Sequence, residues 1–172
     1  RCGSSSPITT IIDRFRATGF AQPAQGAAAI VTVARPQTGA ATWTYTDTFG
    51  RTVETLARNL NGGLTETDTT YDPLGRVLNS TPATLVGDLK YATERQYDGL
   101  SRVIQTNQAL GDIDGSGQNT IALTMIAYQG SSVVTTERVH GQSQQRTETK
   151  NAIGKVASEK DANGQTTQFQ YD

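Results

Sequence analysis

The sequence contains few of the residues that build disulfide bonds, zinc sites or a thick hydrophobic core. One cysteine, Cys2, and one histidine, His140, occur among 172 residues, so no internal disulfide and no Cys/His zinc site can form. Hydrophobic residues make up 35% of the chain and aromatic residues 6%. This content is thin for a two-sheet sandwich with a dry interior and favours a single sheet that is partly wet on both faces.

Long apolar runs and an excess of charge of one sign are also missing. No stretch approaches the 20 or so apolar residues of a membrane-spanning helix, and no segment resembles a signal peptide. The formal net charge is −1 at pH 7, which gives no electrostatic reason to expect a nucleic acid or an anionic membrane as a partner.

What the sequence does contain is a recurring turn. In the heptamer Tyr71–Val77 (YDPLGRV), Asp72 takes the first turn position, where its carboxylate can accept backbone N–H groups. Pro73 presets φ at the second position and Gly75 occupies the fourth. The flanking Tyr71 and Val77 are good strand formers. The heptamer is therefore typical of a strand that ends in a tight turn.

The same frame returns along the chain at a nearly constant spacing. Asp47 and Asp72 are 25 residues apart, and Asp72 and Asp98 are 26 apart. A period in this range is the signature of a repeat architecture. The copies are Thr46–Thr52, Tyr97–Val103 with Ser in the glycine place, Lys150–Val156 without the tyrosine, a decayed Tyr128–Val134, and the terminal Tyr171-Asp172.

A second set of turn signals falls about half a period after the first, so each repeat is predicted to be two strands of roughly ten residues. We therefore expect an all-β protein of consecutive antiparallel β-hairpins that form one curved sheet. This second set comprises Asn61–Gly63, Gly87-Asp88, Asp112–Gly117, Gly141 and Asp161–Gly164.

The Tyr-Asp-x-x-Gly-Arg-Val frame resembles the YD repeat, also called the RHS repeat, over about residues 41–172, and Asp161–Asp172 resembles a near-consensus copy. Proteins with this repeat include shell components of bacterial Tc toxins, RHS polymorphic toxins, wall-associated proteins and teneurins. The resemblance implies a segment of a hollow β-spiral shell that encloses a toxin or effector polypeptide. It also implies a bacterial protein, secreted or at the cell surface. The implied partners are the rest of that shell, its C-terminal effector and other toxin-complex subunits. The alternative is a cell-surface adhesion or carbohydrate-binding module of the wall-associated or teneurin kind.

We divide the chain into an N-terminal segment, residues 1–40, and the hairpin array, residues 41–172. The first is either a set of degenerate repeats or an entry segment, with strands expected within Ile8–Phe20 and at Ala29–Val33. Because the chain does not begin with methionine and stops inside a turn motif, we interpret it as a fragment of a longer protein.

The repeated acidic and basic residues are interpreted as structural, because catalytic groups are usually single whereas structural devices recur. We expect a turn cap and a partly exposed ion pair in each unit, and no enzyme activity. The predicted motif residues are Asp47, Gly50, Arg51, Tyr71, Asp72, Gly75, Arg76, Tyr97, Asp98, Arg102, Asn151, Gly154, Asp161, Gly164, Tyr171 and Asp172.

Asp112 and Asp114 form the one pattern that suggests a metal. Alternating carboxylates with glycine resemble the start of a calcium-binding loop. However, Leu123 stands where such a loop needs a bidentate carboxylate. A long polar hairpin loop is the favoured interpretation, and neither a metal nor a cofactor is expected.

Overall fold

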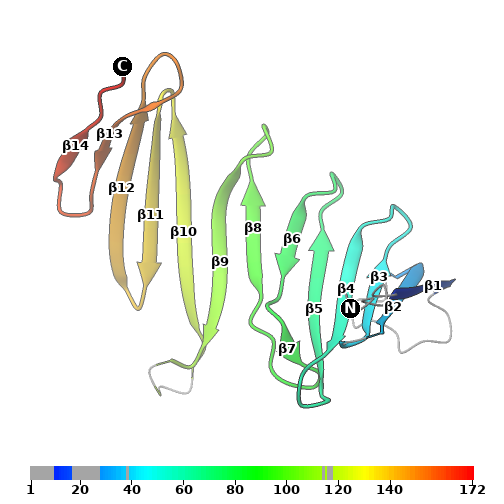
Figure 1. Ribbon diagram of the computed structural model, residues 1–172. Coiled ribbons are helices and arrows are strands. Elements are labelled where there is room, and N and C mark those ends of the chain that lie inside the picture. Colours follow the sequence, from blue (N-terminus) through cyan, green and yellow to red (C-terminus); the bar gives the residue numbers. More distant parts are fainter. Residues whose placement is uncertain (1–9, 17–27, 38, 114, 116–117) are drawn as a thin grey trace, which may run out of the picture. The chain divides into compact units, whose positions relative to one another are not determined.

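The computed structural model describes residues 10–16, 28–37, 39–113, 115 and 118–172. These residues form fourteen β-strands and no helix (Figure 1). The all-β prediction is therefore confirmed. Contacts divide the chain into two compact units, Arg1–Lys90 and Tyr91–Asp172.

In the first unit, each strand from β1 to β5 pairs antiparallel with the next strand in the sequence. β6 pairs with the C-terminal half of β5, and the short β7 pairs with its N-terminal half. The strands are β1 (Thr10–Arg16), β2 (Ile30–Pro36), β3 (Thr42–Thr46), β4 (Thr52–Arg58), β5 (Leu64–Tyr71), β6 (Val77–Ser80) and β7 (Thr84–Leu85).

The second unit is built in the same way, and every strand pairs antiparallel with the next. The predicted up-and-down order of hairpins is thus present in both units. The strands are β8 (Thr93–Tyr97), β9 (Val103–Gly111), β10 (Thr120–Gln129), β11 (Ser132–Val139), β12 (Gln142–Lys150), β13 (Val156–Lys160) and β14 (Thr166–Gln168).

The two strands expected near the N-terminus are β1 and β2. β1 covers the described part of the predicted segment Ile8–Phe20. β2 pairs with β3, and Ile30 lies opposite Thr46. Residues on both sides of position 40 therefore share one ladder, while the division into residues 1–40 and 41–172 stays a prediction.

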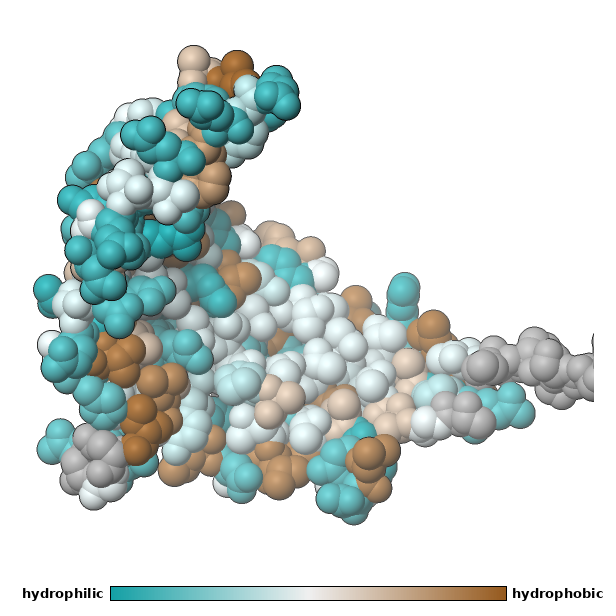
Figure 2. Space-filling model, turned by 60° about the vertical axis from the view of Figure 1, so that its left-hand side comes forward, coloured by the Kyte–Doolittle hydropathy of each residue, from teal (hydrophilic) through white to brown (hydrophobic). Residues whose placement is uncertain are grey.

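The buried hydrophobic residues of the described chain are few and lie together on β2, β3 and β4. Val31 and Val33 are fully buried, and Tyr45 and Val53 are nearly so. Val31 and Val33 share a face because side chains alternate along a strand, and Tyr45 lies directly opposite Val31. Figure 2 shows hydrophobic residues in small groups among polar and neutral ones. The core is as small as the composition suggests.

The turns place glycine where the chain needs a left-handed conformation, and Gly154 is an example with φ of +80°. Apart from its two chain neighbours, no described residue has an atom within 4 Å of the position that its Cβ would take, and the same holds for Gly99, whose φ is outside that region. Substitution at Gly154 therefore changes the backbone energy alone. Gly117, which the sequence predicts to lie in a long loop, is outside the described residues.

We predict that Gly154→Ala lowers the free energy of unfolding by about 1–2 kcal/mol, because alanine pays the left-handed penalty. Gly99→Ala is the matched control and should leave stability unchanged or raise it by up to about 1 kcal/mol. Urea denaturation measures both. Equal losses for the two variants would contradict the assigned turn conformation.

Candidate functional site: the repeated aspartate–arginine turn

The turn between β5 and β6 closes with two backbone hydrogen bonds. The N–H of Asp72 donates to the carbonyl of Arg76 at 2.9 Å, and the N–H of Gly75 donates to the carbonyl of Asp72 at 2.9 Å. Gly75 has φ of +81°, and the register shifts at Thr70/Tyr71. This pattern is a three-residue hairpin loop, a type I turn followed by a glycine bulge.

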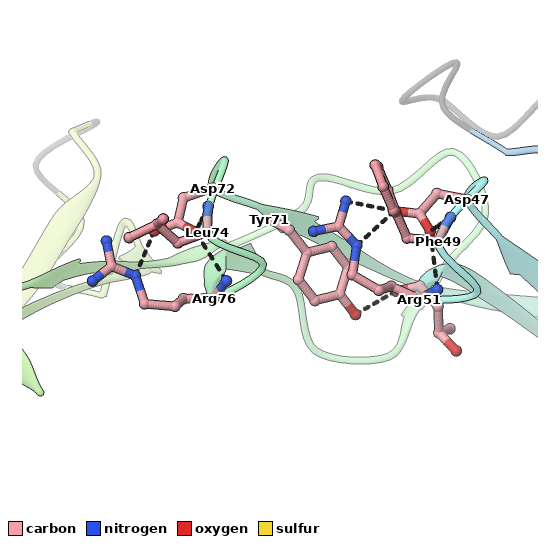
Figure 3. A network of polar contacts seen from close by, with 8 residues as sticks. Asp47, Phe49, Arg51, Tyr71, Asp72, Leu74 and Arg76 are labelled. Carbon is pink, nitrogen blue, oxygen red and sulfur yellow. Dashed lines mark hydrogen bonds and ion pairs between the residues drawn. The ribbon is translucent and has the colours of Figure 1, made fainter. Parts of the chain in front are cut away.

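The Asp72 carboxylate holds this turn together from inside (Figure 3). Its Oδ1 accepts the backbone N–H groups of Leu74 and Arg76, each at 2.9 Å. Its Oδ2 accepts Nε of the Arg76 guanidinium at 2.6 Å. One side chain therefore satisfies two backbone donors and pairs with a cation.

The same backbone geometry recurs in both units. Asp47 and Asp98 repeat it in full, including the guanidinium of Arg51 or Arg102. The backbone part alone recurs at three further positions, where the fifth turn residue is not arginine: Asn59 with Gly63, Asn151 with Lys155, and Asp161 with Gln165. Gly50, Gly62 and Gly164 have positive φ at the fourth position of their turns.

The Asn59 turn was not predicted in this form. The sequence suggested a turn at Asn61–Gly63, but the residue that caps it is Asn59, whose Oδ1 accepts the N–H groups of Asn61 and Gly63 at 3.0 and 2.8 Å. An Asx residue three positions before a glycine was the available signal. It lacked the tyrosine and the arginine of the heptamer Tyr71–Val77.

A tyrosine links each of two full turns to the hairpin that follows. The Arg51 guanidinium lies 4.5 Å from the ring centroid of Tyr71, and the Tyr71 hydroxyl donates to the carbonyl of Thr52 at 2.8 Å (Figure 3). In the second unit, Arg102 lies 4.0 Å from the ring of Tyr128, whose hydroxyl donates to the carbonyl of Val103 at 3.1 Å. In both cases the tyrosine therefore packs on the arginine of the previous aspartate–arginine turn, one hairpin earlier in the chain.

The C-terminal copies keep part of this link. Lys155 Nζ lies 4.7 Å from the ring centroid of Tyr171, while Asp172 is exposed. Tyr97 ends β8 and lies opposite Val103. The contact with the preceding basic residue was missed, because it depends on how successive hairpins register.

The electrostatics of the three full turns favour ionised aspartates. For Asp47, desolvation opposes ionisation, but hydrogen bonds from Arg51 and Phe49 outweigh it and hold the pKa below its ordinary value. Asp72 follows the same balance, with Arg76 as the main donor. For Asp98, the backbone hydrogen bond from Arg102 is the largest cause of the lowered pKa.

A second ionic cluster lies in the first unit and was not predicted. Glu54 on β4 and Glu66 and Asp68 on β5 are buried, and one carboxylate oxygen from each lies within 4.8 Å of the others. Lys90 Nζ contacts Asp68 Oδ2 at 2.5 Å and Glu66 Oε1 at 3.0 Å. The lysine loses hydration there, but the two carboxylates outweigh this loss and raise its pKa.

Of the remaining candidates, the structure describes Asp112 and His140. Asp112 follows β9 and is exposed, and Asp114 lies outside the described residues. His140 is exposed in the two-residue turn that it forms with Gly141, where both have positive φ. Cys2 also lies outside the part of the chain that the structure describes.

No protein-family model matches the chain, and no curated protein is significantly similar to it. In the described ranges, no helix is long and apolar enough to cross a membrane.

Asparagine at Asn151 retains the backbone hydrogen bonds of the turn without a negative charge, which suggests a graded test at Asp98. At pH 7 we expect unfolding free energy to fall in the order wild type, Asp98→Asn, Asp98→Ala, because asparagine loses the ion pair and alanine also loses the backbone acceptor. The Asp98 pKa is lowered in the folded state, so its contribution is present above the ordinary aspartate pKa of about 3.9. That contribution is lost as the pH falls through the folded-state pKa.

Chemical denaturation of the three proteins between pH 7 and pH 2 measures this effect. The difference between wild type and Asp98→Asn should shrink towards pH 2, and a difference that stays constant would contradict the ion-pair role.

The tyrosine link has its own test in Tyr71→Phe, which keeps the ring over Arg51 and removes the hydroxyl that bonds to Thr52. We expect a loss of about 0.5–1.5 kcal/mol, the usual net value of one hydrogen bond, and a larger loss for Tyr71→Ala. Urea denaturation checks both variants. No difference between the phenylalanine and alanine variants would show that the ring contact contributes nothing.

Proposed function

We propose that this chain is a non-catalytic segment of an RHS-type shell that encloses a toxin or effector polypeptide and protects it before delivery. The observation that supports this most is the identity of the linking residues. The tyrosine, aspartate, glycine and arginine of the repeated frame are the residues that close one hairpin and tie it to the next, as Arg51 and Tyr71 do. The repeated residues thus make the contacts that join one hairpin to the next. Such a repeat fits a shell wall that grows by the addition of hairpins.

The composition of the strands also fits a wall. The described residues bury few hydrophobic side chains, and many strand positions are threonine or glutamine, as in β12. Both faces of such a strand array can therefore be in contact with water. A shell wall needs this property, because one of its faces lines the interior of the shell and the other faces the solvent. The recurrence of the Asp–Arg pair in three turns supports a structural role over a catalytic one.

Under this proposal, the partners are the rest of the shell, the C-terminal effector that it encloses and other subunits of a toxin complex. The location is outside the bacterial cell or at its surface. Nucleic acid is not among the proposed partners, because the net charge of −1 gives no electrostatic reason to expect binding to phosphates.

The test uses the full-length protein in which this segment lies. We expect its C-terminal polypeptide to resist proteinase K, and expect protection to be lost when Arg51 and Arg102 are both changed to alanine. Arg138→Ala, at an exposed strand position outside the turns, is the matched control and should retain protection. Mass spectrometry of the digest identifies the protected fragment.

A C-terminal polypeptide digested equally fast with and without the repeat region would overturn the shell proposal. Glycan or cell-surface binding by the same protein, without any protected fragment, would favour the adhesion module instead.

A further inference from the structure

We propose that Glu54, Glu66 and Asp68 form a binding site for a divalent cation of the calcium type, and that Lys90 is the built-in competitor for that site. The proposal rests on the cluster itself and does not depend on the proposed shell function. Nothing in the repeated turn frame contributes to it.

The strand register brings the three carboxylates together. Glu54 on β4 lies directly opposite Asp68 on β5, and Glu66 precedes Asp68 by two residues, on the same face of β5. All three residues are at most 9% exposed, and one oxygen of each lies within 4.8 Å of the others. Three carboxylates can therefore face a single point in the first unit.

The cluster gathers acidic residues around one lysine. Like charges directly opposite each other in a sheet are destabilising, and a buried charge needs a partner. Lys90 contacts Asp68 at 2.5 Å and Glu66 at 3.0 Å. A divalent cation would add positive charge at the point where the three carboxylates come together.

An independent observation indicates that one carboxylate oxygen of the cluster, Asp68 Oδ1, is available to a ligand. Asp68 has a side chain that is 6% exposed, and its Oδ1 is buried with no hydrogen-bond partner among the described residues. Thr70, the next residue on the same face of β5, also has a buried hydroxyl oxygen for which the described part of the chain offers no partner. Buried polar atoms are rarely left unsatisfied, and a bound cation would satisfy a carboxylate lone pair that no donor reaches.

The types of ligand atom in the cluster indicate which cation it would bind. The cluster offers carboxylate oxygens and no thiolate or imidazole, which favours hard cations over zinc or copper. Calcium accepts six to eight oxygens in flexible geometry, including bidentate carboxylates, whereas magnesium demands near-ideal octahedral geometry and keeps several waters. A crowded set of three carboxylates suits calcium better.

Lys90 can give way to the ion. Its side chain is 24% exposed, and it lies on the segment after β7 rather than in the ladder that carries the carboxylates. An ammonium on a flexible four-carbon stem can move into solvent when a cation enters. Binding should therefore become tighter when the lysine is removed.

The test is a calcium titration of the purified chain, followed by the shift in melting temperature and by luminescence of terbium, a calcium substitute. Tyr45, which lies opposite Glu54, serves as the excitation donor. We expect calcium to raise the melting temperature and to bind at least tenfold more tightly to Lys90→Met. Asp68→Asn should lose both signals, with its fold checked by circular dichroism.

The control is the double variant Asp112→Asn with Asp114→Asn, which removes the other carboxylate pair and should bind calcium as the wild type does. The proposal is overturned if neither the wild type nor Lys90→Met responds to calcium. It is also overturned if Lys90→Met alone responds, because the lysine then fills the site permanently, or if the response disappears in the double variant. Lys90→Met retains all three carboxylates, so the test does not depend on the stability of Asp68→Asn.

Discussion

The rest of the structure depends on one interaction, the hydrogen bonding of an aspartate carboxylate to the backbone N–H groups of the turn that it begins. In the Asp72 turn, one oxygen accepts two backbone N–H groups and the other accepts the arginine at the end of the turn. The turn is thus satisfied without help from a core. In the equivalent Asp47 turn, Arg51 held in this way becomes a surface on which the next tyrosine packs. Because exposed ion pairs contribute little on their own, the value of the pair lies in positioning the guanidinium.

This arrangement explains how a long strand array holds its order with so small a core. The buried hydrophobic residues of the described chain are confined to β2, β3 and β4. The second unit relies on ladder hydrogen bonds and on turn contacts such as that of Arg102 with Tyr128. Cross-strand and stacking contacts contribute fractions of a kcal/mol to about 1 kcal/mol each. Stability is therefore spread along the chain rather than concentrated in one place.

The sequence predicted what is decided locally and missed what is decided by register. The turns at Asp47, Asp72 and Asp98 follow from residue types within five positions, and the regular spacing of the turn signals gives the all-β class. The link from Tyr71 to Arg51 joins residues of two different hairpins, which no local pattern reveals. The buried carboxylates were missed because the Thr-Glu-Thr-Asp-Thr pattern alternates perfectly but does not say which face is covered.

The buried carboxylates also constrain that register. Side chains alternate with a period of two, so a one-residue slip between β4 and β5 would move Glu54 away from Asp68 and turn one set of residues to the other face. In the observed register Asp68 and Glu66 both reach Lys90, whereas a slipped strand would leave the lysine facing threonines. Thr65 and Thr67 would pair equally well in either register, and most of β5 has no hydrophobic pattern that would favour one register over the other. The acidic residues fix the register instead. Unlike a hydrophobic core, they do so at the cost of bringing like charges together.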